Sequence, residues 1–230
     1  GLVGSEMCIR DRVYVSFAAI AVISYLLGSL NFGVILSKKL KKDDVRKHGS
    51  GNAGSTNMLR SFGAKFGILT IVGDMLKVFV AIFIAIKIFE HTPMLLVSNP
   101  LTNITVFVKA YAGFFCVMGH IFPCFFKFKG GKGVATSGGM VFAIDWRIAL
   151  ILLAVFIVVV LITRYVSLGS IVMAVLYPVM MYLFYRSADL TIIAVIFTVI
   201  VLITHIPNIA KLIIHTENKV DFSKFKKSEK

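Results

Sequence analysis

The chain has 230 residues, 58% of them hydrophobic, with 25 Lys and Arg against 11 Asp and Glu, and its mean hydropathy is +0.89. This composition excludes an ordinary soluble domain, and the recurring apolar runs indicate a polytopic α-helical membrane protein. The net charge of +14 has a topological explanation, because cytoplasmic loops of membrane proteins collect Lys and Arg. We therefore expect no nucleic-acid partner.

Seven apolar segments follow a suspect N-terminal stretch. Residues 1–12 (GLVGSEMCIRDR) resemble a non-native leader, so we expect the membrane domain at 13–210 and a basic cytoplasmic tail at 211–230. The apolar segments are 13–37, 66–89, 104–126, 134–144, 147–163, 168–185 and 189–206. Most approach the ~20 residues that cross a bilayer. The segment at 134–144 is short, so it predicts a short or broken span, or a re-entrant piece.

The distribution of Lys and Arg predicts the orientation of these segments. If the loop at 38–65 is cytoplasmic, 18 of the 25 Lys and Arg fall in regions on the cytoplasmic side. A six-span arrangement would place the last loops on the side that their charges disfavour. We therefore predict an all-α integral membrane protein with seven transmembrane helices, its N-terminus outside and its C-terminus in the cytoplasm.

Two glycine-rich segments carry the chemistry. The first glycine loop is residues 48–60 (HGSGNAGSTNMLR), and the second glycine loop is residues 127–139 (KFKGGKGVATSGG). Glycines let backbone N–H groups converge on an anion, and Arg or Lys neutralises phosphate oxygens. Either loop alone could be a flexible connection. Together, on one predicted face of the membrane, they suggest an enzyme that acts on phosphorylated substrates.

Neither loop is a nucleotide-binding P-loop. Gly49 and Gly54 have the required spacing, but Ser55 stands where the phosphate-binding lysine belongs. In the second glycine loop, Lys132 is followed by Gly133 instead of Ser or Thr. ATP hydrolysis is therefore not expected, although both loops retain the features of an anion site.

Polar residues in or beside the apolar segments have structural alternatives. His120 precedes the second glycine loop. Its position suits either a contact with phosphate or a polar cap. His205 and Asn208 share one face only if the helix continues through Pro207, and alone they indicate a structural pair. Asp74 and Lys77, three residues apart inside an apolar segment, predict an internal ion pair, whereas the small residues Gly28, Ser29 and Gly33 predict close helix packing.

Several chemistries are absent from the pattern. No histidine has an aspartate five positions later, and no Cys-His or Ser-His-Asp arrangement is evident. Any general base is therefore hidden or comes from the substrate. Cys8, Cys116 and Cys124 lack metal-ligand spacing and indicate free thiols. We expect no metal and no other cofactor.

Five motifs together resemble one family: GSLNFG (28–33), HGSGNAGSTNMLR (48–60), GHIFPCFFKFKGGKGVATSGG (119–139), HIPNI (205–209) and ENK (217–219). They are similar to the acyl-phosphate-dependent glycerol-3-phosphate acyltransferases of bacteria, the PlsY family. The resemblance implies a seven-helix enzyme of the bacterial cell membrane with its active site facing the cytoplasm. It implies transfer of a fatty acyl group from acyl phosphate to the 1-hydroxyl of sn-glycerol 3-phosphate. Lysophosphatidic acid and phosphate are the implied products, in the first step of phospholipid synthesis.

The resemblance also implies site residues and partners. The catalytic residues would be Ser50, Arg60, Lys129, His205 and Asn208. Contacts to the substrate phosphates would come from Gly51, Asn52, Gly54, Thr56, Asn57, His120, Gly131, Lys132 and Gly133. The implied partners are glycerol 3-phosphate, acyl phosphate, membrane lipids and the enzyme that supplies acyl phosphate. Asn31, where proline is usual, and Ser55, where alanine is common, depart from the family's pattern.

The sequence leaves two other classes of protein open. A phosphate or organophosphate transporter also needs cationic, glycine-rich sites, but its sites commonly lie near the bilayer midplane between internal repeats. The chain shows no convincing repeat, and its anion-binding residues gather at one predicted face. A non-catalytic assembly factor would not need two such loops. If the protein is an enzyme, the lack of an evident general base in the sequence suggests that the leaving phosphate takes the proton of the attacking hydroxyl.

Overall fold

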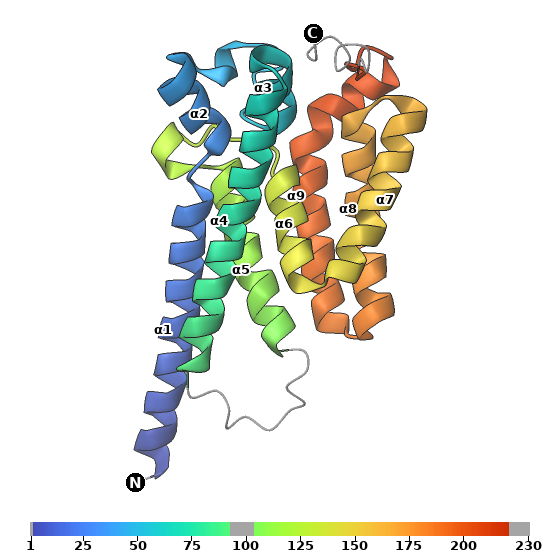
Figure 1. The fold of residues 1–230 in the computed structure, drawn as a ribbon. Helices are drawn as coiled ribbons and strands as arrows, with labels where there is room; N and C mark the ends of the chain where they lie inside the picture. The colour runs from blue at the N-terminus through green and yellow to red at the C-terminus, as the bar shows by residue number, and fades with distance from the viewer. Residues whose placement is uncertain (1, 93–103, 221–230) are drawn as a thin grey trace. The chain divides into compact units, whose positions relative to one another are not determined.

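The computed structural model describes residues 2–92 and 104–220, and the regular structure in these ranges is helical (Figure 1). The chain packs as two compact units, Gly1–Ile144 and Asp145–Lys230. The first unit contains α1 (Leu2–Gly28), α2 (Phe32–Lys41), α3 (Ser55–Phe62), α4 (Ala64–Glu90), α5 (Ile104–Ile121) and α6 (Val134–Ile144), with 3-10 turns at Val45–Lys47 and Cys124–Phe126. The second unit contains α7 (Trp146–Thr163), α8 (Val166–Tyr185) and α9 (Ala188–Ile213).

The apolar segments of the sequence all contain a helix. Among the described residues, six spans are long and apolar enough to cross a membrane: Asp11–Lys41, Ala64–Glu90, Ile104–Phe126, Trp146–Thr163, Val166–Tyr185 and Ala188–Ile213. The segment predicted to be short is α6, with 11 residues. The described residues thus confirm the all-helical prediction, whereas the count of seven spans and the orientation of the termini stay predictions. Residues 2–12 of the predicted leader at 1–12 form the first part of α1.

The first apolar segment differs from the prediction, because it forms two helices. α1 ends at Gly28 and α2 begins at Phe32. The Oδ1 atom of Asn31 accepts a hydrogen bond from Val34 N at 3.2 Å, so this side chain caps the new helix. Hydropathy alone misses such a break, because the capping residue lies within an apolar run.

Close contacts and a buried ion pair hold the first unit together. α1, α4 and α5 pack on one another, α6 packs on α4 and α5, and α2 and α3 pack on α4 (Figure 1). A Cβ atom on Gly28 would overlap the main chain of Cys116, which confirms close helix packing at this glycine. Lys77 Nζ lies 2.8 Å from Asp74 Oδ1, so the predicted ion pair is also confirmed.

Lys77 also completes the break between α1 and α2. Its Nζ atom donates to Gly28 O at 3.0 Å and to Leu30 O at 3.1 Å. These carbonyls lie where α1 ends, so they lack partners from a continuing helix. The ammonium group thereby stabilises the point from which α2 leads to the first glycine loop.

The second unit is a layer of three helices in which α8 packs on both α7 and α9. Asp145 and Ser187 cap α7 and α9 through hydrogen bonds to Arg147 N and Leu190 N. Large apolar side chains are exposed along these helices, among them Leu150, Ile157, Leu161, Val179, Ile196 and Ile203. Such outward apolar faces suit contact with lipid hydrocarbon.

Candidate functional site

One buried amide holds the first glycine loop in shape. The Nδ2 atom of Asn57 donates to Val45 O at 3.0 Å, to His48 O at 2.9 Å and to Asn52 O at 2.9 Å. Its Oδ1 atom accepts a hydrogen bond from Ser50 N at 3.0 Å. The side chain is only 2% exposed. Asn57 therefore bonds to the loop itself, and its predicted contact with a phosphate stays a prediction.

The glycines of the first glycine loop are required by its geometry. Gly49 and Gly51 have φ angles of +53° and +72°, which L side chains rarely adopt. A Cβ atom on Gly49 would also overlap Asn57 Oδ1. Ser50, between these glycines, is exposed. The backbone thus presents the Ser50 hydroxyl on a tight turn.

The first glycine loop runs directly into α3. Asn52 Oδ1 accepts a hydrogen bond from Gly54 N at 2.9 Å, and Gly54 is the N-cap of α3. Thr56 lies in the first turn of α3, where backbone N–H groups face outward and favour an anion. Arg60 is exposed on the same helix. Four apolar side chains form a buried cluster beneath this segment: Val34, Val45, Ala53 and Met58.

The second glycine loop packs against His120. Gly131 N donates to His120 O at 3.2 Å, and a Cβ atom on Gly131 would overlap His120 Nε2. Gly133, with φ of +81°, begins the turn into α6. Lys129 is exposed, and Lys132 is half-buried. The imidazole ring therefore supports the loop from behind while Lys129 faces outward.

His120 itself belongs to a buried polar cluster. Its Nδ1 atom lies 2.9 Å from Lys77 Nζ and 3.4 Å from Asp74 Oδ1, and the residue is only 2% exposed. The cluster joins α4 and α5 beneath the second glycine loop. A direct contact between His120 and a phosphate stays a prediction, since the ring lies below the loop surface.

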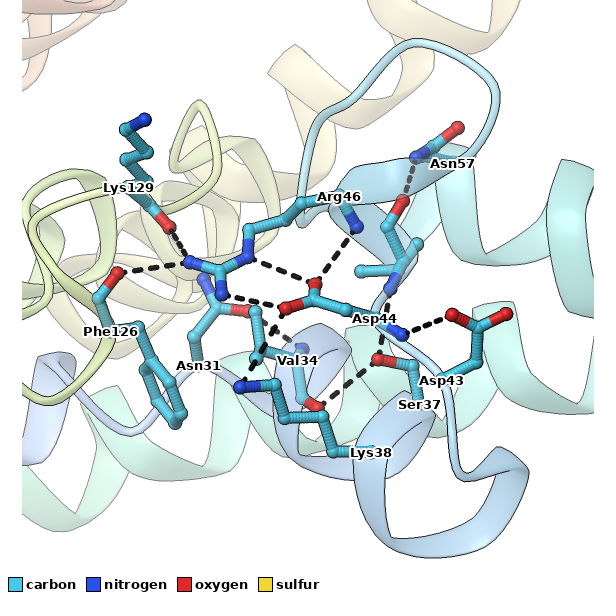
Figure 2. Close-up of polar contacts among 11 residues, drawn as sticks. Asn31, Val34, Ser37, Lys38, Asp43, Asp44, Arg46, Asn57, Phe126 and Lys129 are labelled. Carbon is cyan, nitrogen blue, oxygen red and sulfur yellow. Dashed lines mark hydrogen bonds and ion pairs between the residues drawn. The ribbon is translucent and has the colours of Figure 1, made fainter.

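Arg46, just before the first glycine loop, pairs with Asp44 and bonds to backbone carbonyls at the second glycine loop, as Figure 2 shows. Arg46 donates from Nε to Asp44 Oδ1 at 3.0 Å and from Nη2 to Asp44 Oδ2 at 2.7 Å. Its Nη1 atom donates to Phe126 O at 2.9 Å and to Lys129 O at 3.0 Å. We call this pair the Asp44–Arg46 clamp. The side-chain hydrogen bond from Arg46 lowers the pKa of Asp44 to about 2, so the carboxylate is ionised at neutral pH.

The second unit contains the remaining predicted pair. His205 and Asn208 both lie on α9, which continues through Pro207. His205 Nδ1 donates to Val201 O at 2.8 Å, because a carbonyl oxygen can only accept. Asn208 Nδ2 donates to Glu217 Oε1 at 2.8 Å, and Ser167 Oγ donates to the same oxygen at 3.0 Å. Glu217 thus joins α8, α9 and the segment after α9.

The predicted residues therefore fall into two groups. The first unit holds both glycine loops with Ser50, Arg60 and Lys129, and the second unit holds His205 and Asn208. No role was predicted for Asp44, Arg46, Ser167 and Glu217. The ENK motif was a signal for Glu217, whereas the charges of Asp44 and Arg46 were counted only as part of a basic loop. In the described ranges, no group of three or more His, Cys, Asp or Glu is arranged to hold a metal ion.

Comparison with known proteins gives consistent matches. A family model described as "Glycerol-3-phosphate acyltransferase" matches residues 18–215. A protein of that name from Clostridioides difficile (strain 630) is 41% identical over 206 residues, covering 89% of this chain and 96% of the relative. One from Bacillus subtilis (strain 168) is 38% identical over 203 residues, covering 88% of this chain and 97% of the relative.

Two solved structures are also similar. Both are crystal structures of PlsY, an integral membrane glycerol 3-phosphate acyltransferase. The glycerol 3-phosphate form is 33% identical with a TM-score of 0.79, and covers 91% of this chain and 98% of that chain. The lysophosphatidic acid form is 33% identical with a TM-score of 0.76, and covers 90% of this chain and 96% of that chain.

Proposed function

The chain belongs to the glycerol-3-phosphate acyltransferase family, and it is an integral membrane acyltransferase. We propose that its acyl donor is acyl phosphate, that its acceptor is the 1-hydroxyl of sn-glycerol 3-phosphate, and that its products are lysophosphatidic acid and phosphate. The observation that carries the proposal is the pair of glycine loops joined in one unit by Arg46. A reaction between two phosphorylated substrates needs two anion sites close together, and each loop offers backbone N–H groups with a cationic side chain.

In the proposed reaction, no covalent enzyme intermediate forms. The hydroxyl oxygen of glycerol 3-phosphate forms a bond to the acyl carbon, and the bond between that carbon and the phosphate oxygen breaks. The departing phosphate takes the electron pair and then the hydroxyl proton. Acyl phosphate is already activated, so the protein's task is to position the substrates and neutralise their charge.

The roles proposed for the side chains follow their chemistry. Arg60 would bind phosphate oxygens with its guanidinium fork, and Lys129 would neutralise charge on a phosphoryl group. The exposed Ser50 hydroxyl and the backbone of Gly51, Asn52, Gly54 and Thr56 would hydrogen-bond a phosphate. The backbone of Gly131 and Gly133 and the side chain of Lys132 would do so in the second glycine loop. Asn57 and His120 would act by shaping the loops, because their side chains are bonded within the protein.

The catalytic roles of His205 and Asn208 rest on their match to the HIPNI motif of the family and stay predictions. His205 Nδ1 donates to Val201 O at 2.8 Å, and the residue is only 2% exposed, so the ring is held within α9. Glu217 Oε1 accepts a hydrogen bond from Asn208 Nδ2 at 2.8 Å, so the orientation of this amide is fixed within the protein.

The localisation proposed here is the bacterial inner membrane, with both glycine loops facing the cytoplasm. Glycerol 3-phosphate is anionic and water-soluble, so it would reach the loops from the aqueous side, whereas the acyl chain would enter from the bilayer. Acyl phosphates hydrolyse readily, which makes the enzyme that supplies them a plausible neighbour in the membrane.

The experiment is release of inorganic phosphate by detergent-purified protein given palmitoyl phosphate, with and without glycerol 3-phosphate. We expect release that depends on glycerol 3-phosphate, with lysophosphatidic acid formed in equal amount. Arg60→Ala should lower the rate at least ~100-fold, because loss of a charge-assisted contact to phosphate weakens transition-state binding. Lys65→Ala, which removes an exposed cation at the start of α4, is the matched control and should keep activity.

Two outcomes would contradict the proposal. Turnover with palmitoyl coenzyme A, and not with palmitoyl phosphate, would identify a thioester as the acyl donor. No turnover with any donor, from protein shown to be folded, would favour a transporter, since transport cannot occur in detergent. Uptake of glycerol 3-phosphate into reconstituted vesicles would then decide between a transporter and an inactive protein.

A further inference from the structure

We propose that the Asp44–Arg46 clamp is a positioning device, which holds the second glycine loop, and with it Lys129, in register with the first glycine loop. Arg46 comes just before the first glycine loop, and its two carbonyl partners lie 80 and 83 residues further along the chain. This inference rests on the proposed function for the role of Lys129. The link between the loops is independent of that function.

The bonds of Arg46 are arranged to fix a main-chain segment. Two donors of the guanidinium bind the Asp44 carboxylate, and the Nη1 atom binds the carbonyls of Phe126 and Lys129 (Figure 2). Asp44 Oδ1 also accepts a hydrogen bond from Arg46 N at 3.1 Å. The planar group is thus held by the carboxylate on one side while it binds the loop on the other.

The two carbonyls flank the most constrained part of the second glycine loop. Lys127 and Phe128 both have positive φ angles, +59° and +57°. Residues with side chains rarely adopt this conformation in succession, and surrounding contacts must maintain it. Phe126 O and Lys129 O lie immediately before and after this pair. Main-chain hydrogen bonds also brace this turn, from Lys129 N to Phe126 O at 3.3 Å and from Phe128 N to Pro123 O at 3.0 Å. Arg46 adds to them by binding both ends of the turn, and the turn determines the direction of Lys129.

A second salt bridge in the chain shows that the local pair alone does not produce this link. Arg147 bonds to Asp145 through the same atoms, with Nε to Oδ1 at 3.0 Å and Nη2 to Oδ2 at 2.7 Å. Among the described residues, the Arg147 guanidinium otherwise stacks over the Phe184 ring at 5.1 Å. The Arg147 side chain is 56% exposed, whereas that of Arg46 is 20% exposed. Arg147→Ala is therefore a matched control.

The first test measures the link without using activity. Trypsin cleaves after Lys127 and Lys129, which are both exposed. We expect cleavage after these lysines to be at least ~10-fold faster in Arg46→Ala than in the wild type, because opening of the loop controls its proteolysis. Asp44→Asn, which retains Arg46 but weakens its anchor, should show a smaller increase. Arg147→Ala should be cleaved like the wild type.

The second test measures the consequence for the reaction. We expect Arg46→Ala to lower kcat with palmitoyl phosphate by ~30-fold or more while KM for glycerol 3-phosphate changes less than ~3-fold, since a misplaced Lys129 affects the transition state more than binding. Added guanidinium should partly restore kcat in Arg46→Ala, and Arg46→Lys should retain more activity than Arg46→Ala. Arg147→Ala should keep the wild-type kcat and be unaffected by guanidinium.

The outcomes separate this inference from the proposed function. If cleavage after Lys127 and Lys129 is unchanged in both Arg46→Ala and Asp44→Asn, Arg46 does not hold the second glycine loop and the link is overturned. Faster cleavage with unchanged kcat would overturn the positioning role. If the wild type has no acyltransferase activity but the variants are cleaved faster, the proposed function fails and the link stands. Should Arg46→Ala not fold, Asp44→Asn and Arg46→Lys carry both tests.

Discussion

At the scale of single residues, side chains that bond to the main chain decide the shape of both glycine loops. Asn57 bonds to four backbone groups around the first glycine loop, and Arg46 bonds to two carbonyls at the second. The side chains proposed to meet substrate, such as Ser50 and Lys129, are exposed at these loops. Residues that shape the site and residues that face it are therefore different residues.

We expect Asn57→Ala to destabilise the protein by at least about 2 kcal/mol, because several buried loop groups lose their partner. Asn57→Asp should be no better, since it replaces the amide NH2 group, which lies within hydrogen-bond distance of three carbonyls, by an acceptor. Thermal unfolding in detergent measures the loss. Thr191→Val is the control, because the Thr191 hydroxyl donates locally, to Ser187 O at the N-cap of α9. Equal effects of the Asn57 and Thr191 changes would contradict this role of the amide.

The Asp44–Arg46 clamp predicts a specific pH dependence. The pKa of Asp44 is lowered from 3.8 to about 2 in the folded protein, so its contribution to stability is present above about pH 4 and is lost as the pH falls towards 2. Allowing for solvent screening, this contribution is about 1 kcal/mol. The stability difference between wild type and Asp44→Asn, measured by denaturation in micelles, should be constant above pH 4 and shrink below it. A difference that vanishes already near pH 6 would exclude this origin.

At the scale of elements, the glycines of the second glycine loop and of α6 differ in what surrounds them. Gly131 lies against the His120 ring, whereas Gly138, on α6, has no neighbouring atom within 4 Å of an added Cβ. The same substitution therefore has opposite expected effects at two positions only seven residues apart.

We expect Gly131→Ala to lower acyltransferase activity at least ~10-fold, because the methyl group displaces the loop from His120. Gly138→Ala should keep activity and stabilise the protein by up to ~1 kcal/mol, since alanine is the better helix former. Phosphate release and thermal unfolding of the two variants provide the comparison. Full activity in folded Gly131→Ala would show that the loop accommodates a side chain.

The predictions from the sequence rested mainly on the length of the apolar segments and on the spacing of the glycines. Hydrocarbon demands long apolar helices, so the helical segments and the short α6 were confirmed. The break at Ser29–Asn31 was missed, because capping depends on one side chain and not on hydropathy. Arg46 was missed because its partners at Phe126 and Lys129 are backbone carbonyls far along the chain, and Asp44 was missed with it because it bonds to Arg46. The catalytic roles of Ser50, Arg60, Lys129, His205 and Asn208 stay predictions.

At the scale of the whole molecule, the crossing of α6 decides the topology. If α6 spans the membrane, Arg186 lies outside and His215 lies in the cytoplasm. If α6 is re-entrant, both are reversed. His91 and Lys47 precede α6 and are unaffected, so they serve as internal references.

One cysteine introduced at each of these exposed positions tests the seven-span prediction, in a background with Cys8 and Cys124 replaced by serine and the fully buried Cys116 kept. A membrane-impermeant maleimide applied to intact spheroplasts should label His91→Cys and Arg186→Cys. Lys47→Cys and His215→Cys should react only after lysis. Labelling of His215→Cys in intact cells together with protection of Arg186→Cys would establish six spans.

The contacts of Arg46 have a consequence for how this protein can change. Arg46 recognises carbonyl groups, and every amino acid has one, so it is indifferent to the side chains at positions 126–129. Phe125 and Phe128 are 56% and 61% exposed, and exchanging them would alter what the loop presents without altering what holds it. Sequence drift and deliberate redesign can therefore both proceed at this rim, within the limits set by the positive φ angles of residues 127 and 128, as long as Arg46 is kept.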